Sequence, residues 1–330
     1  MTASAKPIAR PTRTEGTMSR AVWGWTRPLV AAATLTAVVW QLGIDPFLDG
    51  VRAVDGAVLA LGAALGVLTT VACAWRWTIV SHGLGLRLSL PAAIAGYYRS
   101  IFLNLTLPGG IVGDVHRGVS HGRNVGEVGL AVRAVAWERT AGQVVQAIVT
   151  IAVLLVLPSP VRPSVTVVLL ALLPLVVIAT LLRSTRAEEG RTRWARLRRA
   201  VAEDVRRGLL PRKAWPAIAL ASLLVVGGHA TAFVFAARTA GATAPLTQLV
   251  PLALLALLAM VLPSVAGWGP REGLTAWAFA AAGLGAAQGV ATAVVYGVMA
   301  FVAGLPGALV LVAAWVPRPA VAQTDGPADA

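Results

Sequence analysis

Long stretches without a charged side chain constrain this sequence more than any other feature. The longest runs from Gly273 to Pro317, and others cover Gly56–Trp75 and Thr140–Leu157. A helix that crosses the roughly 30 Å hydrocarbon core of a bilayer needs about 20 apolar residues. The charged fraction is 13% and the mean hydropathy is +0.75, whereas soluble domains carry about 25% charged residues. The sequence therefore predicts an integral membrane protein built from helices.

Counting the apolar runs predicts an all-α polytopic fold with about six full spans. Two additional apolar segments are broken by proline and glycine, and we expect them to form re-entrant hairpins. Hydropathy alone also allows a count of eight or nine spans. The six predicted spans are residues 28–44, 56–75, 127–157, 164–182, 214–237 and 286–316.

The two broken segments follow one pattern, in which Leu-Pro precedes glycines and then ionisable residues. The first covers residues 100–123 and the second covers residues 260–273. Proline lacks a backbone N–H and glycine adds backbone freedom, so neither continues an ordinary helix. Interrupted helices in membrane proteins line polar cavities, because their free backbone groups need polar partners. We therefore expect a polar site where the two segments meet.

The order of the parts predicts an inverted repeat. In each half a span precedes a broken segment, and a long helix follows it, but the orientation is reversed between the halves. Repeat one covers about residues 56–157 and repeat two about residues 214–316, within a membrane domain of residues 28–316. The remaining parts are a basic tail (1–27), a basic loop (183–213) and a polar tail (317–330).

The positive charges predict orientation in a membrane. The net charge is +14, and lysine and arginine cluster in the first tail and in the loop of residues 183–213. Such clusters mark the cytoplasmic side, so we expect both termini there and do not expect a nucleic-acid partner. Arg76 is interpreted as the cytoplasmic end of its span, with Trp75 and Trp77 as interfacial anchors. The composition is typical of a bacterial protein from a high-GC genome, and the inner membrane is the expected location.

The acidic residues outside the loops and tails point to a candidate site. Asp114 and Glu272 lie in the broken segments, Glu138 lies in the membrane part of the long helix, and Glu127 is expected at the membrane interface. Ionisable groups in a membrane usually face a cavity or a partner. We expect Arg117 to pair with Asp114, Arg139 or Arg133 with Glu138, and Arg271 with Glu272. In one interpretation, these ion pairs only lock the broken helices in place. Alternatively, Arg117, Arg139 and Arg271 could bind a phosphate bidentately while the acids hold them.

The candidate substrate-binding residues combine these charged groups with the turns and their polar neighbours. They are Asn104, Pro108, Gly109, Gly110, Asp114, His116, Arg117, Glu138, Arg139, Pro263, Gly267, Gly269, Arg271 and Glu272. No motif of a hydrolase, P-loop or zinc enzyme is present, so the sequence favours a non-enzymatic protein without a catalytic residue, metal or cofactor. The only cysteine, Cys73, excludes a disulfide within the chain.

Three stretches together resemble the lysylphosphatidylglycerol synthase transmembrane-region family, also called the flippase-like domain family. They are FLNLTLPGGIVGDVHRG (102–118), WERTAG (137–142) and LPSVAGWGPREG (262–273), and GLPG (304–307) also fits. The resemblance covers about residues 25–316 and implies a polytopic bacterial inner-membrane protein. In the family this module is thought to move an aminoacylated phospholipid between leaflets. Because the chain ends at Ala330, we expect the aminoacyl-transferase domain to be absent.

The leading hypothesis is a protein that translocates, or helps to translocate, an anionic phospholipid or another phosphate-bearing lipid. One alternative is a membrane-embedded enzyme that acts on a lipid-linked substrate, with Asp114 or Glu272 as a base. Another is a non-catalytic subunit that docks a cytoplasmic lipid-modifying enzyme through residues 183–213. The sequence does not define the oligomeric state, the lipid or the energy source.

Overall fold

The structure is a computed structural model that describes residues 39–107, 110–157, 193–260 and 268–315, with residues 33 and 36. Its regular elements in these ranges are helices, as the sequence predicts for an all-α protein. Of the span expected at 28–44, only residues 33, 36 and 39–44 are described, and the span expected at 164–182 lies outside the described residues. So do Pro108, Gly109, Pro263 and Gly267 of the candidate site.

Four helices of the described chain are long and apolar enough to cross a membrane. They are α3 (Gly56–Gly83), α6 (Val128–Val156), α9 (Ala214–Thr239) and a stretch, Ala286–Ala313, formed by α12 (Ala286–Gly304) and α13 (Pro306–Trp315). At 1.5 Å per residue each exceeds the roughly 30 Å hydrocarbon core. These helices coincide with four of the six predicted spans. The last is interrupted at Leu305, directly before a proline that has no N–H to donate.

The prediction that the second span ends at Arg76 is wrong. Helix α3 continues to Gly83, and both Arg76 and Trp77 are buried inside the protein, with 5% and 2% of their surface exposed. The residues after Arg76 carry no feature that ends a helix until the turn at Gly85, whose φ is +86°. Trp77 is therefore an interior side chain and not an interfacial anchor.

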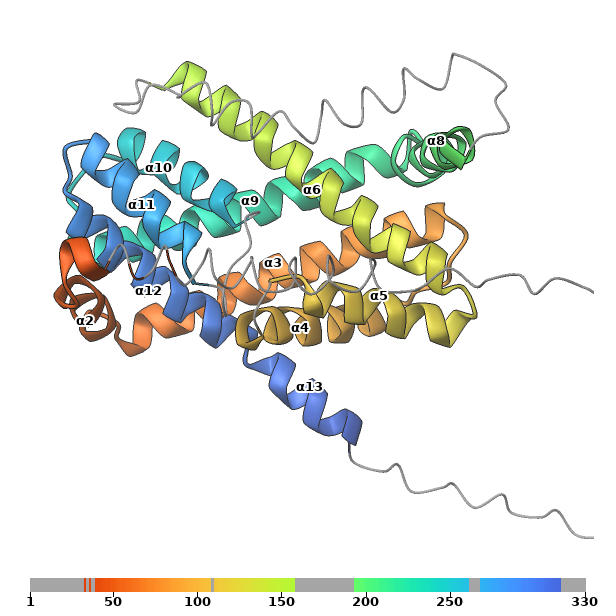
Figure 1. The fold of residues 1–330 in the computed structure, drawn as a ribbon, viewed down its shortest axis with the longest axis horizontal. Coiled ribbons are helices and arrows are strands. Elements are labelled where there is room, and N and C mark those ends of the chain that lie inside the picture. The colour runs from red at the N-terminus through yellow and green to blue at the C-terminus, as the bar shows by residue number, and fades with distance from the viewer. Residues whose placement is uncertain are drawn as a thin grey trace, which may run out of the picture.

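Each broken segment consists of two helices, as predicted. The first comprises α4 (Leu90–Thr106) and α5 (Val112–Val125), which pack against one another. The second extends upstream of residue 260 and comprises α10 (Leu246–Ala259) and α11 (Pro270–Ala281), which also pack together. In Figure 1 the α4–α5 pair lies at the lower right of the view and the α10–α11 pair at the upper left.

The centre of the molecule is formed by α3, α9 and α12, which pack on one another. The largest apolar cluster lies between α9, α10, α11 and α12 and includes Phe233, Leu249, Phe279, Tyr296 and Met299. Short elements cover both ends. Helix α2 (Asp45–Arg52) packs on α12, while α8 (Arg193–Asp204) and the π-helix η2 (Val205–Leu209) lie beside the ends of α3 and α6 (Figure 1).

Candidate functional site

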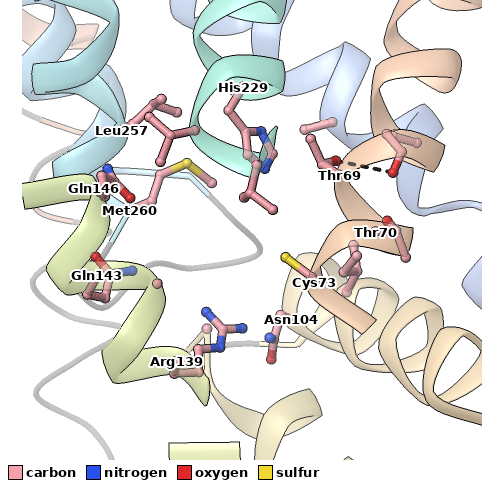
Figure 2. Close-up of a pocket in the computed structure, with 18 of the residues that line it drawn as sticks. Thr69, Thr70, Cys73, Asn104, Arg139, Gln143, Gln146, His229, Leu257 and Met260 are labelled. Carbon is pink, nitrogen blue, oxygen red and sulfur yellow. Dashed lines mark hydrogen bonds between the residues drawn. The ribbon is translucent and has the colours of Figure 1, made fainter. Parts of the chain in front are cut away.

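A pocket of about 280 Å³ lies where the two broken segments approach each other. The ends of the first segment contribute Asn104, Leu105 and Gly110, and the ends of the second contribute residues 259–260 and 270–271. Helices α3, α6, α9 and α12 complete the wall. Figure 2 shows polar side chains from several helices around this space. The interruptions in both halves of the chain thus converge on one site.

Asp114 on α5 ties three helices together. Its carboxylate accepts hydrogen bonds from Arg117 Nε (3.0 Å), Ser100 Oγ (3.1 Å) and Asn104 Nδ2 (3.1 Å). It also accepts a hydrogen bond from the guanidinium of Arg139 on α6. A buried carboxylate is costly unless charged and polar donors surround it. The contacts therefore fix α4, α5 and α6 in one arrangement.

The junction between α4 and α5 is closed by two local features. The side-chain oxygen of Asn104 accepts a hydrogen bond from the backbone N–H of Gly113 at 2.8 Å. Gly113 is packed so closely against the backbone of Ser100 that a Cβ atom would overlap it. A glycine at position 113 is therefore required for the close approach of the two helices.

Glu138 on α6 is fully buried and binds two arginines. Arg76 donates to Oε1 through Nε (2.9 Å) and Nη2 (2.6 Å), and Arg117 donates to Oε2 through Nη2 (2.7 Å). Tyr97 also donates to Oε1, at 3.0 Å. The remaining Arg76 nitrogen, Nη1, donates to Ser222 Oγ on α9 at 3.0 Å. Glu138 thereby connects α3, α4, α5 and, through Arg76, α9.

Arg117 is held between aromatic rings. Its Cζ atom lies 4.1 Å from the ring centroid of Tyr97 and 4.7 Å from that of Trp77. A guanidinium over an aromatic face gains a cation–π attraction that is stronger when the groups are desolvated. Arg117 has a fully buried side chain and is not among the residues that line the pocket.

The ion pairs around Asp114 and Glu138 form one network, and this network carries an excess positive charge. Arg76, Arg117 and Arg139 contribute +3, and Asp114 and Glu138 contribute −2, which leaves +1. Arg139 is the most accessible member, with 43% of its side chain exposed, and it lines the pocket together with Arg76. The side of the network that faces the pocket is therefore cationic.

A second ion pair lies at the start of α11. Arg271 donates to Glu272 Oε1 through Nε (3.0 Å) and Nη2 (2.5 Å), and the backbone N–H of Gly269 donates to Oε2 at 2.6 Å. Gly269 has φ of +121°, a conformation that favours glycine. The carboxylate thereby caps the backbone N–H that precedes the helix. Arg271 lines the pocket, whereas Glu272 is fully buried behind it.

The two clusters share several features. Arg271 lies 5.6 Å from the ring centroid of Trp268 and 5.1 Å from that of Tyr296, much as Arg117 lies between a tryptophan and a tyrosine. A glycine also faces a guanidinium in each half. A Cβ atom at Gly142 would lie 2.8 Å from Arg76 Nη1, and one at Gly297 would lie 2.7 Å from Arg271 Nη2. Each arginine therefore occupies the space that a side chain at the glycine position would fill.

The structure places the predicted site residues in three groups. Asn104, Gly110, Arg139 and Arg271 line the pocket. Five others lie behind this wall as partners or packing residues: Asp114, Arg117, Glu138, Gly269 and Glu272. His116 is exposed and is not part of the wall. Among the described residues no group of three or more histidine, cysteine or acidic side chains could hold a metal ion.

The predicted ion pairs are correct in two cases and wrong in one. Arg117 binds Asp114 and Arg271 binds Glu272, as expected. Glu138 binds neither of the arginines proposed for it. Arg139 binds Asp114 instead, and Arg133 binds Asp204 at 3.2 Å. Neighbouring residues on a helix point in different directions, so the Glu138 carboxylate meets α3 and α5 while Arg139 faces the pocket.

Sequence reasoning missed Arg76 as a member of the site. An available signal was that no charged residue follows it for the rest of α3, so it lies inside a long apolar helix rather than at its edge. Gln143, Gln146 and His229 also line the pocket. Neither glutamine is among the site residues predicted from the sequence. Figure 2 shows Arg139, Gln143 and Gln146 along α6, with Cys73 and Thr70 of α3 across the space from them.

The helices and the internal ion-pair network define a multi-pass helical membrane protein. A family model described as the lysylphosphatidylglycerol synthase TM region matches residues 24–307. This is most of the chain, and the protein belongs to that family. Membership connects it to membrane lipid metabolism or lipid translocation. No match was found among curated proteins.

Proposed function

We propose that this protein translocates, or helps to translocate, a phosphate-bearing lipid between the leaflets of the bacterial inner membrane. The observation that carries the proposal is the cationic pocket at the ends of both broken segments. Three arginines line it, and the ion-pair network that includes two of them, Arg76 and Arg139, has a net charge of +1. A lipid phosphate supplies the missing negative charge.

Arginine suits this role because its planar guanidinium donates two parallel hydrogen bonds to a phosphate. Arg139 and Arg271 are the phosphate ligands in this proposal, since each reaches the pocket from a different half of the chain. Arg117 and the three acids are positioning residues that hold the guanidinium groups. Arg76 also faces the pocket, although Glu138 and Ser222 bind its nitrogens.

The broken segments are proposed to be re-entrant hairpins within an inverted repeat. Support comes from the matching order of helices and from the Arg, Trp and Tyr grouping in each half. Transporters with inverted repeats bind substrates near the bilayer midplane between discontinuous helices. A pocket between the ends of α4 and α10 fits that arrangement. The cytoplasmic placement of residues 183–213 and of both termini belongs to the same proposal.

Enzymatic chemistry has less support from the geometry. A general base must reach the proton that it removes. Asp114 and Glu272 are buried behind the wall, and arginines bind both carboxylates. Docking of a cytoplasmic enzyme through residues 183–213 stays an alternative, since residues 183–192 and the side chains of residues 193–198 lie outside the described part.

Reconstitution into vesicles tests the proposal. Phosphatidylglycerol with a fluorescent acyl chain is placed in both leaflets, and an impermeant quencher reports movement to the outer leaflet. Arg139→Lys and Arg271→Lys keep the charge but remove the bidentate fork, so each should slow movement at least tenfold. Arg52→Lys is the control, because Arg52 is exposed on α2 and lies outside the pocket. Wild-type rates in both pocket variants would contradict the phosphate-ligand proposal.

A further inference from the structure

The pocket wall contains arginines but no carboxylate among the described residues that form it. Arg76, Arg139 and Arg271 line it. Residues 108–109 and 261–267, which connect the helices of each broken segment in the sequence, contain no acidic residue. A cationic headgroup placed here would meet like charges and no carboxylate partner in the described wall, which is unfavourable where water is scarce.

The nearest carboxylates are already engaged. Asp114 accepts hydrogen bonds from two arginines, Glu138 from two, and Glu272 from one arginine and a backbone N–H. Pairing an ammonium group with any of them would require breaking a buried arginine contact. Removing one partner from a buried pair is strongly unfavourable. The acids therefore support the arginines and are not available to a ligand.

The remaining polar groups of the wall are amides together with hydroxyls, a thiol and the imidazole of His229. Gln143 and Gln146 lie on α6 and Asn104 on α4 (Figure 2). The Nε2 atom of Gln146 is buried and has no acceptor among the described residues. A buried donor without an acceptor is costly. A hydroxyl or phosphate oxygen of a ligand can accept from the amide groups of these glutamines, whereas an ammonium group has only donors and can pair only with their oxygens.

The size of the pocket agrees with a headgroup as occupant. Small-molecule sites typically measure about 300–1,000 Å³, and this pocket of about 280 Å³ lies at the lower end. A phosphate with a small polar substituent is of suitable size, while two acyl chains are not. The acyl chains would remain in the surrounding bilayer.

We infer that the headgroup bound here is a phosphate ester of a neutral polyol, such as phosphoglycerol or a phosphosugar. A headgroup with a free ammonium, as in an aminoacylated phospholipid, is disfavoured. The inference rests on the proposed function and names its substrate class. The arginines bind the phosphate, and the amides of Gln143 and Gln146 bind the hydroxyl groups.

Two lipids with identical acyl chains test the inference, namely phosphatidylglycerol and lysylphosphatidylglycerol. In reconstituted vesicles, phosphatidylglycerol should move about tenfold faster than lysylphosphatidylglycerol, or more. The repulsion in one poorly screened like-charge contact is large enough to change an equilibrium or rate by a factor of about ten. Gln143→Glu adds a carboxylate to the wall at almost constant shape, and it should reduce this preference. Gln248→Glu is the matched control, since Gln248 lies in the first turn of α10 and not in the wall.

A binding measurement separates failure of this inference from failure of the proposed function. The purified protein in detergent is offered both lipids in competition, and native mass spectrometry counts the bound species. Preferential binding of phosphatidylglycerol supports the inference even if neither lipid moves in vesicles, a result that would remove only the translocation proposal. Equal or stronger binding of lysylphosphatidylglycerol would overturn the inference, whatever the transport rates.

Discussion

Replacing Glu138 with glutamine should destabilise the protein more than any other single neutralisation in the site. Glu138 is fully buried and accepts four hydrogen bonds, three of them from guanidinium groups. Glutamine has nearly the same shape, but its amide nitrogen is a donor. One of the two arginines would then face a donor, and the charge of the network would rise from +1 to +2.

The magnitude follows from the cost of breaking a buried ion pair. Removal of one partner typically costs about 3–5 kcal/mol, because the other charge remains buried without compensation. Two arginines depend on Glu138, so we expect a loss near the upper end of this range. Glu272→Gln should cost less, since Glu272 binds one arginine and one backbone amide.

The assay is unfolding in detergent with the double variant as control. Combining Arg76→Gln with Glu138→Gln restores the net charge of +1, since the network keeps Arg117, Arg139 and Asp114. The double variant should therefore regain part of the lost stability, with a coupling energy of about 0.5–3 kcal/mol. A stability of Glu138→Gln within about 1 kcal/mol of wild type would refute the reasoning. So would a double variant that is simply the sum of the two single changes.

Three further predictions concern other parts of the molecule. Gly297→Ala should reduce lipid movement and lower the free energy of unfolding by about 1–3 kcal/mol through overpacking, because a Cβ there would meet Arg271 Nη2 at 2.7 Å. Gly227→Ala is the control, because the space around Gly227 is open. Asp204→Asn weakens the contacts with Trp137 Nε1 (3.0 Å) and Arg133, so hydrogen exchange of residues 199–209 should accelerate while that of α3 is unchanged. A cysteine at position 196, in a Cys73→Ser background, should resist an impermeant maleimide in intact cells, and labelling there would contradict the cytoplasmic placement.

The helices could be predicted well because their signals are local. Uncharged runs predicted α3, α6 and α9, and proline with glycine predicted the breaks between α4 and α5 and between α10 and α11. These signals depend on residues within one turn or one span. The one boundary that was clearly wrong, at Arg76, arose because an arginine after an apolar run has the same local appearance whether it meets headgroups or a buried carboxylate.

The partners in the site could be predicted only where they are close in sequence. Arg117 binds Asp114 three residues away, and Arg271 binds its neighbour Glu272. The contact between Arg76 and Glu138 joins residues 62 positions apart. It depends on how α3 packs against α6, which no local pattern specifies. The missing acceptor of Gln146 Nε2 likewise became visible only with the pocket.

The claim that the pocket binds a phosphate-bearing headgroup can be tested most directly at Cys73. This residue is the only cysteine of the chain and lines the pocket, so alkylation of the detergent-solubilised protein reports its occupancy. Short-chain phosphatidylglycerol should slow alkylation by about tenfold or more in the wild type and much less in Arg139→Lys combined with Arg271→Lys. Diacylglycerol with the same chains should give no protection. Equal alkylation rates with and without phosphatidylglycerol at saturating concentration, or equal protection by diacylglycerol, would contradict the claim.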